Sequence, residues 1–359
     1  MKHKSNIAII TSFPPGTGIF RFAENIFNFD FYSNLLYFRS IQDNFNLKLN
    51  KTLTTINSTI IPDKYAYISS FIFPTIWSRE LKKYEYAHIV SPDFFHLSRY
   101  KKSIIGTVHD LYFLEKGTKL DYSWYYRFFE KLDLNYCTDL LGVTTISKHT
   151  EKLLKHFYPN IKTKAIHNWT QDYFIKMNKL TCRQNLSLPD SKFILLNVSY
   201  SSSNKNLDFL GELMEMLSDD YLLIHIGNTE VKCKNYNRVL NITTHLDDHV
   251  MVEYYNASDL YLAPSTSEGF NFPVIESINC GVPVLGSDIE IFHEVLMDSP
   301  YLIPLNIDQW KDTIESFKDR KVMENATDWY SLKIGQYYKE KRGKKEFIEF
   351  YHSLGIEIE

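Results

Sequence analysis

Two glutamates that stand eight positions apart mark the stretch of this chain with the clearest chemical pattern. Glu268 and Glu276 lie in residues 267–286, which read SEGFNFPVIESINCGVPVLG. We predict that Glu268 lies in a loop and Glu276 about one turn into the following helix, so that both face one crevice. Carboxylates in such a crevice suit the hydroxyl groups of a sugar. Free N–H groups at the helix start suit a phosphate or sugar oxygen. They belong to Gly269, Phe270, Asn271 and Phe272.

The flanking residues define the elements that position these carboxylates. Asp259–Ala263 is a short apolar run that predicts a buried strand, and Pro264–Asn271 predicts a loop. Pro273 suits the first position of a helix, where its missing N–H costs nothing, and Gly281 suits the residue just past the helix end. Val282–Leu285 then begins the next strand. This order predicts an α/β sheet whose carboxyl edge carries the loop and the helix start, and such sheets bind ligands at that edge.

A histidine follows another predicted strand. The apolar run Ile104–Val108 leads directly into His109 and Asp110. A pair of this kind at the carboxyl end of a strand lies where ligand-binding residues collect in α/β folds. The alternative is that His109 is a satisfied loop histidine and that Asp110 caps a helix.

A lysine occupies a comparable place in the second half of the chain. The loop 200–206, YSSSNKN, follows a predicted strand, and Lys205 stands just before a helix. A cation there suits the neutralisation of a pyrophosphate. The alternative is a solvated lysine, which is the usual state of this residue type.

Two glycines, Gly16 and Gly18, follow the first predicted strand and open a helix. Glycine lets backbone approach a ligand closely, and a helix start favours an anion. The alternative is an ordinary tight turn. The turn lacks the third glycine and the spaced acidic residue of a dinucleotide-binding fingerprint, which disfavours an oxidoreductase.

With these residues in view, the chain resembles a known family. The order Glu-Gly-Phe, a second glutamate at the eighth position and then Gly-Val-Pro-Val is similar to the signature of retaining, nucleotide-sugar-dependent glycosyltransferases of the GT-B fold. That branch contains glycogen synthases and many mannosyltransferases. The resemblance implies an α/β GT-B fold with two Rossmann-like domains that face a central cleft.

The resemblance also implies a role for each candidate residue. Glu268 is expected to bind the donor sugar hydroxyls, Glu276 the nucleotide ribose, and His109 the sugar from the opposite domain. Lys205 and the N–H groups near Phe270–Phe272 are expected to stabilise the leaving diphosphate. The implied mechanism uses no metal and forms no stable covalent intermediate.

One loop of this chain matches the family pattern, and one position differs from it. The loop with Gly16 and Gly18 resembles the family's loop over the donor phosphates. The family typically carries an arginine five residues before the lysine, whereas Tyr200 stands at that position here. Either another cation substitutes, or diphosphate binding is weaker, or activity has been lost.

Length and periodicity predict two domains. A chain of 359 residues suits that number, and a polar segment from Asn168 to Pro189 interrupts two runs of alternating strands and helices. The boundary predicts an N-terminal domain (1–170) and a C-terminal domain (171–330). The resemblance implies that the first is the acceptor side and the second the donor side, and that the terminal helices (331–359) cross back to the first domain. The remaining predicted strands are 7–11, 88–90, 140–145, 164–166, 193–198 and 222–226. The predicted helices are 19–27, 124–136, 148–157, 207–217, 248–256, 310–317 and 329–340.

Composition narrows the functional classes. A net charge of −3 gives no broad nucleic-acid footprint, and four cysteines without CxxC spacing favour a reducing compartment over a zinc or disulfide framework. No apolar run approaches the roughly 18 residues of a spanning helix. We therefore expect a cytoplasmic protein without a metal or cofactor. The aromatic and basic stretch 122–131 predicts either a docked helix or contact with the inner face of a membrane.

The favoured function is transfer of a hexose from a nucleoside diphosphate sugar to a hydroxyl acceptor on a glycan or lipid-linked glycan. GDP-mannose and UDP-hexoses are the expected donors, and mannosyl donors are slightly favoured. One alternative is a nucleotide-sugar epimerase or hydrolase of the same fold. Another is a degenerate transferase that acts as a partner subunit. The sequence predicts no oligomeric state.

Overall fold

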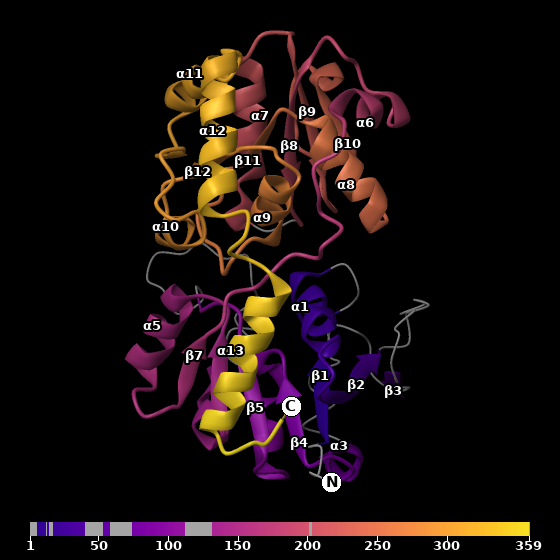
Figure 1. The fold of residues 1–359 in the computed structure, drawn as a ribbon, viewed down its shortest axis with the longest axis vertical. Coiled ribbons are helices and arrows are strands. Elements are labelled where there is room, and N and C mark those ends of the chain that lie inside the picture. Colours follow the sequence, from indigo (N-terminus) through magenta and orange to yellow (C-terminus); the bar gives the residue numbers. More distant parts are fainter. Residues whose placement is uncertain are drawn as a thin grey trace. The chain divides into compact units, whose positions relative to one another are not determined.

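The computed structural model of the chain describes residues 6–11, 13, 17–39, 53–57, 74–111, 131–200 and 203–358. These residues form two compact units. The first contains the described residues of 1–113, 122–168 and 340–359, and the second contains those of 169–339. Each unit has its own parallel sheet and its own helices (Figure 1).

The sheet of the first unit has seven strands in the order β3-β2-β1-β4-β5-β6-β7, all paired in parallel. The strands are β1 (Ile7–Thr11), β2 (Tyr32–Arg39), β3 (Leu53–Asn57), β4 (Tyr86–Ile89), β5 (Ile104–Val108), β6 (Gly142–Thr145) and β7 (Thr163–Ala165). Every residue of β1 and β5 is buried, as expected for strands covered on both faces. The order reverses between β1 and β4, so the crevice of the sheet lies beyond the ends of those two strands.

Helices and 3-10 turns cover this sheet. They are α1 (Gly18–Phe27), α3 (Pro74–Leu81), η2 (Pro92–Arg99), η4 (Asn135–Asp139), α5 (Lys148–Phe157) and α13 (Glu340–Ser353). The Thr17 hydroxyl caps α1 through the Phe20 N–H, and the Ser147 hydroxyl caps α5 through the Thr150 N–H. Both helices therefore begin at a residue whose side chain satisfies a free donor of the first turn.

The last helix, α13, belongs to the first unit (Figure 1). The Phe347 ring contacts Phe22 and His88, with centroids 6.2 and 5.9 Å away. Close packing at the end of the helix requires a glycine in β6, because a Cβ on Gly142 would lie 2.9 Å from both Phe350 and Leu354. The helix α13 therefore packs in the same unit as β1, the first strand of the chain.

The second unit contains six parallel strands in the order β10-β9-β8-β11-β12-β13. They are β8 (Phe193–Val198), β9 (Tyr221–Ile226), β10 (Val239–Ile242), β11 (Leu260–Ala263), β12 (Val284–Ser287) and β13 (Leu302–Ile303). The order reverses between β8 and β11. The switch point of this sheet therefore lies between the loops that follow those two strands.

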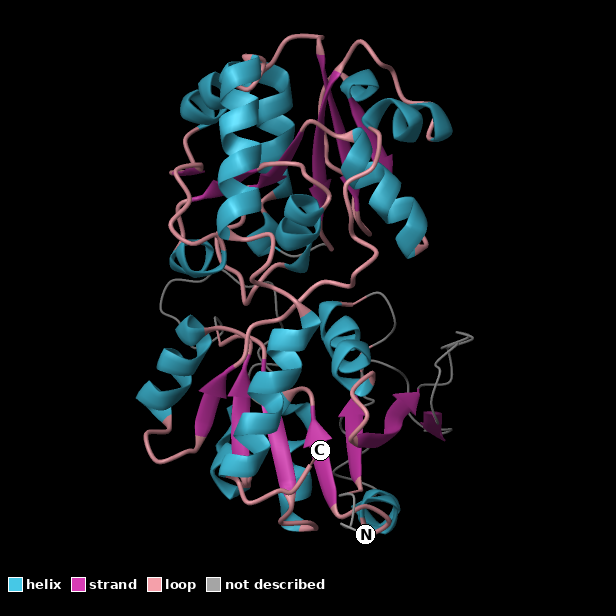
Figure 2. Ribbon diagram, in the orientation of Figure 1, coloured by secondary structure: helices cyan, strands magenta, loops and turns pink. Residues whose placement is uncertain are grey.

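Helices lie on both faces of the second sheet (Figure 2). They are α6 (Lys179–Asn185), η5 (Ser203–Lys205), α7 (Leu207–Met216), η6 (Tyr236–Arg238), α8 (Asp248–Ala257), α9 (Phe272–Asn279), α10 (Glu290–Val295), α11 (Ile307–Ser316) and α12 (Arg320–Lys333). Trp310 of α11 is fully buried and packs edge-on against Phe209 of α7 at 5.3 Å. The core on this face is thus formed by helices far apart in the sequence.

Most predicted elements are confirmed, but several of their bounds are wrong. The strand predicted at 140–145 begins at Gly142, and the helix predicted at 310–317 begins at Ile307. Pro273 is the second residue of α9, which begins at Phe272. The predicted helix 329–340 is wrong, because α12 ends at Lys333 and α13 begins only at Glu340. The N–H of Gly335 bonds back to the Tyr330 and Ser331 carbonyls where α12 ends. The strand predicted to begin at Val282 begins at Val284. Of the predicted helix 124–136 and the aromatic stretch 122–131, residues up to 130 lie outside the described part.

Two further findings concern the class of protein. The four cysteines are free thiols. No helix within the described ranges combines the length and the apolar character needed to cross a bilayer.

Candidate functional site

Two loops meet at the switch point of the second sheet. The loop after β8 and the loop after β11 are joined by backbone and side-chain hydrogen bonds. The Thr266 N–H donates to the Asn204 carbonyl at 2.8 Å, and the Asn204 amide donates to the Ser267 carbonyl at 2.7 Å. The Asn206 amide donates to the Pro264 carbonyl at 3.2 Å. The two loops therefore form one framework at the edge where α/β sheets bind ligands.

Lys205 and Glu268 face one another within this framework. The Lys205 ammonium lies 2.6 Å from Oε1 and 2.8 Å from Oε2 of Glu268. The Glu268 side chain is 6% exposed and the Lys205 side chain 20% exposed. Ser265 Oγ and Asn271 Nδ2 also donate to Oε1, at 2.6 and 2.9 Å. A buried charge needs such partners, and this carboxylate has a cation and two neutral donors.

The helix α9 begins beside this ion pair. Asn271 precedes its first residue and has a left-handed backbone, with φ 74° and ψ 80°. The neighbouring rings of Phe270 and Phe272 are buried and contact each other at 5.7 Å. Because the first N–H groups of a helix have no acceptor within it, the start of α9 presents donors and a partial positive charge.

Glu276 lies one turn further along α9. It is 1% exposed, and its Oε2 accepts a hydrogen bond from the Tyr255 hydroxyl at 2.7 Å. Burial raises the pKa of Tyr261, and the negative charges of Glu268 and Glu276 raise it further. Both carboxylates therefore act on one hydroxyl, at the end of β8, where Tyr261 bonds to Val198. That the two glutamates face one crevice stays a prediction.

His109 directly follows β5 in the first unit. Its Nε2 donates to the Val90 carbonyl at 2.8 Å, and its ring meets Phe22 edge-on at 5.0 Å. Burial lowers the pKa of His109 to about 4, so the imidazole is neutral at pH 7. With its proton on Nε2, the ring presents Nδ1 as a hydrogen-bond acceptor.

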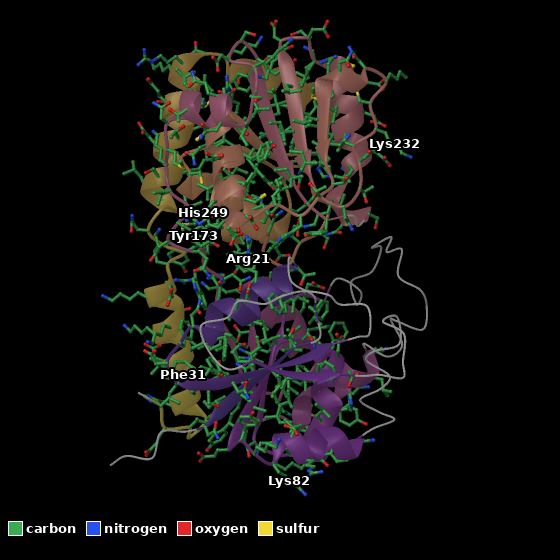
Figure 3. The ribbon with its side chains drawn as sticks, turned by 90° about the vertical axis from the view of Figure 1, so that its right-hand side faces the viewer. Arg21, Phe31, Lys82, Tyr173, Lys232 and His249 are labelled. Carbon is green, nitrogen blue, oxygen red and sulfur yellow. The ribbon has the colours of Figure 1, made fainter. Side chains whose placement is uncertain are left out.

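The glycine loop of the first unit is described in part. Gly18 is the first residue of α1 and is exposed, whereas Gly16 lies outside the described residues. Arg21, labelled in Figure 3, follows in the same helix. Among the sequence candidates, the first unit thus holds Gly18 and His109. The second unit gathers the others: Lys205, Glu268, Gly269, Phe270, Asn271, Phe272 and Glu276.

Three side-chain contacts of the second unit were not predicted from the sequence. Ser265 and Asn271 side chains bind Glu268, although only the Asn271 backbone was expected to take part. Tyr255 binds Glu276 from the preceding helix. A serine in the loop after β11 is only weak evidence for a contact with Glu268. The helical pattern around Tyr255 does not indicate which residue its hydroxyl bonds.

Residues 178–342, slightly less than half of the chain, match the model of the family described as glycosyl transferases group 1. It is 26% identical over 215 residues to the O-antigen biosynthesis glycosyltransferase WclY of Escherichia coli, a match that covers 55% of this chain and 57% of that protein. It is 25% identical over 224 residues to the O-antigen chain mannosyltransferase RfbU of Salmonella typhimurium, covering 59% and 60%. The chain thus spans less than two thirds of the length of these curated relatives.

Solved structures extend the likeness to the whole chain. The sucrose-phosphate synthase of Thermosynechococcus elongatus superposes with a TM-score of 0.75 at 16% identity and covers 98% of this chain and 99% of that one. HepE of Anabaena, in complex with UDP and glucose, gives 0.74 at 13% identity, covering 97% and 100%. WaaG, a glycosyltransferase of lipopolysaccharide biosynthesis, gives 0.74 at 12% identity, covering 96% and 99%. These matches confirm the expected GT-B fold.

Proposed function

We propose that this protein is a glycosyltransferase that moves a hexose from a nucleoside diphosphate sugar to a hydroxyl acceptor on a glycan or lipid-linked glycan. One observation carries the proposal. A cation, two carboxylates and the start of a helix gather at the switch point of the second sheet. These are the groups needed to hold a diphosphate, a sugar and a ribose.

The departure of the diphosphate is the main electrostatic problem of the reaction. Lys205 uses two of its three N–H groups on the two oxygens of Glu268, which leaves the third for a phosphate oxygen. The start of α9 adds backbone donors and its partial positive charge. Groups fixed in this way stabilise the charge that develops as the bond to the sugar breaks.

The hydrogen bonds of Glu268 leave it able to bind a hydroxyl of the transferred sugar. Three of its hydrogen bonds fall on Oε1, from Lys205, Ser265 and Asn271, and one falls on Oε2, from Lys205. Oε2 therefore keeps acceptor capacity for a sugar hydroxyl. In this proposal Glu276 binds the ribose hydroxyls, and the neutral His109 accepts a hydrogen bond from a sugar hydroxyl through Nδ1.

We propose that transfer needs no metal and retains the configuration of the anomeric carbon. Lys205 and the start of α9 supply the positive charge that a metal would otherwise supply. In this proposal the diphosphate and the sugar both bind beside the ion pair of Lys205 and Glu268. Within the described residues, no group of three or more acidic, histidine or cysteine side chains is suited to hold an ion.

A thermal-shift screen tests the proposal. The protein is heated with GDP, UDP and ADP and with their hexose conjugates, and we expect one nucleotide series to raise the unfolding temperature. The mannosyltransferase among the relatives and the neighbour bound to UDP and glucose make GDP-mannose and UDP-glucose the first donors to try. If no nucleotide stabilises the protein, the proposal is wrong.

Product analysis then separates the reaction classes. The donor that binds is incubated with and without hydroxyl acceptors, and the products are followed by NMR. Transfer yields a glycoside with the anomeric configuration of the donor, and it requires an acceptor. Epimerisation or hydrolysis proceeds without one, and either result would replace transfer as the function.

A further inference from the structure

We infer that Tyr255, a residue of α8, is a positioning residue for Glu276 and thereby part of the nucleotide site. The inference rests on the proposed function, because it assumes that Glu276 binds a ribose. It goes further in assigning the orientation of that carboxylate to a hydroxyl from a different helix. The site then includes α8 as well as the loops at the switch point.

The geometry is that of a fixed donor and a fixed acceptor. Tyr255 is fully buried, and its hydroxyl lies 2.7 Å from Oε2 of Glu276. Its ring is held on two sides, by Phe174 at 5.8 Å and by Tyr261 at 6.2 Å between centroids. Because the Tyr255 ring is packed in this way, it keeps one side-chain rotamer. The position of its hydroxyl therefore favours one rotamer of the Glu276 carboxylate.

Both ends of α8 are anchored, which fixes the Tyr255 backbone. At the end of the helix, the Asn256 amide accepts from the Met177 N–H at 2.6 Å and donates to the Ile175 carbonyl at 3.0 Å. At its start, the Tyr173 hydroxyl donates to the Asp248 carboxylate. The ring of Tyr173 lies beside that of His249, 6.2 Å between centroids (Figure 3).

The chemistry of the carboxylate explains why such a donor is useful. A glutamate has three rotatable bonds, and an unrestrained carboxylate must lose that freedom when a ribose binds. The Tyr255 hydroxyl fixes the orientation of the carboxylate before the ribose binds. Removal of this single oxygen should therefore weaken contacts to the ribose and leave contacts to the phosphates intact.

A cycle of protein and ligand changes tests this inference. Tyr255→Phe removes only the hydroxyl and keeps the packed ring. Calorimetry compares the nucleoside diphosphate that binds the wild type with its 2′,3′-dideoxy analogue, on both proteins. We expect Tyr255→Phe to weaken the complete nucleotide by about tenfold and to bind the dideoxy analogue like the wild type.

A matched control removes the same atom elsewhere in the second unit. The hydroxyl of the buried Tyr330 bonds to the Val284 carbonyl at 2.7 Å and to Ser299 at 2.8 Å. Tyr330→Phe should leave the affinities for both ligands unchanged. Equal weakening of both ligands by Tyr255→Phe would show a merely structural role and overturn the inference, as would no weakening of either. A wild type that binds no nucleotide would instead overturn the proposed function, and this inference with it.

Discussion

The ion pair between Lys205 and Glu268 gives the sharpest test of how the site is built. Lys205→Met removes the cation and leaves Glu268, at 6% exposure, with only the Ser265 and Asn271 donors. Loss of one partner from a buried pair costs about 3–5 kcal/mol. Because Lys205 is itself 20% exposed and two donors remain, we expect the lower value, about 3 kcal/mol.

Differential scanning calorimetry measures this cost. For a unit of this size, 1 kcal/mol shifts the unfolding midpoint by about 2–4 °C, so Lys205→Met should lower the midpoint of the second unit by about 6–12 °C. The double variant Lys205→Met, Glu268→Gln should recover most of that loss, because a neutral amide oxygen keeps both remaining donors and no charge is left buried. Sugar transfer should nevertheless be lost in both variants, since stability returns without the cation.

An exposed ion pair in the same unit supplies the control. Lys234 bonds to Glu215 with its side chain 88% exposed. Lys234→Met should shift the midpoint within the range of a surface pair, under about 1 kcal/mol, and leave transfer unchanged. If Lys205→Met kept the wild-type midpoint and turnover, the argument that Lys205 both balances a buried charge and stabilises the leaving group would be refuted.

Three further predictions follow from single residues. Glu276→Ala should weaken nucleoside diphosphate binding by about tenfold or more in calorimetry, since in the proposed function it removes charged hydrogen bonds to the ribose. Unchanged affinity would count against that role. The pKa of His109 is lowered by burial to about 4, below the usual 6.5, so its stabilising contribution is complete above pH 6.5 and is lost as the pH falls through about 4. Unfolding midpoints at pH 7 and pH 5 should therefore differ less in His109→Gln than in the wild type. The pKa of His293 is raised by its hydrogen bonds to Asp288 and Asp298, so its contribution is present below pH 6.5 and is lost as the pH rises through the raised value. His293→Gln should lower stability at pH 6 more than at pH 9, and an equal loss at both would contradict this assignment.

The central strands of both sheets were predictable because each is a short, mostly apolar run. β1, β5 and β8 agree residue for residue with their predicted ranges. Buried parallel strands need no alternation, so a short apolar run bounded by polar residues is a sufficient signal.

Elements held by tertiary contacts were not predictable. The helix α6 reads KLTCRQN and has no apolar stripe. It is fixed by Arg183, which donates to the Asp259 carboxylate at 2.7 Å and to the Ala257 carbonyl at 2.9 Å. The edge strand β13 has two residues, which is too short for any periodicity. In both cases the stabilising partner lies far away in the sequence.

The candidate site divides in the same way. The spacing of Glu268 and Glu276 and the helix between β11 and β12 followed from local signals in the sequence. The partners did not: Ser265 and Tyr255 are unremarkable in the sequence and gain meaning only when the loop after β11 and the helix α8 are placed beside the glutamates. A hydrogen-bond partner is set by tertiary structure, and no residue type at a fixed spacing specifies it.

Two asparagines beside the candidate site have strained backbones, as do Ser187, Met297 and Asp298 elsewhere in the described chain. Asn206 and Asn271 both adopt left-handed backbones, with φ of 56° and 74°, immediately before α7 and α9. A left-handed residue other than glycine costs about 1 kcal/mol, and asparagine tolerates it best. Each side-chain amide then bonds across the framework, Asn206 to the Pro264 carbonyl and Asn271 to Glu268. Strain persists only where the surroundings over-determine a conformation, and it concentrates at functional sites. The two loops are therefore held in one arrangement before a ligand binds, which lowers the entropy cost of binding. Glycine would adopt these backbone angles with less strain, but it lacks the side-chain amide that makes these hydrogen bonds.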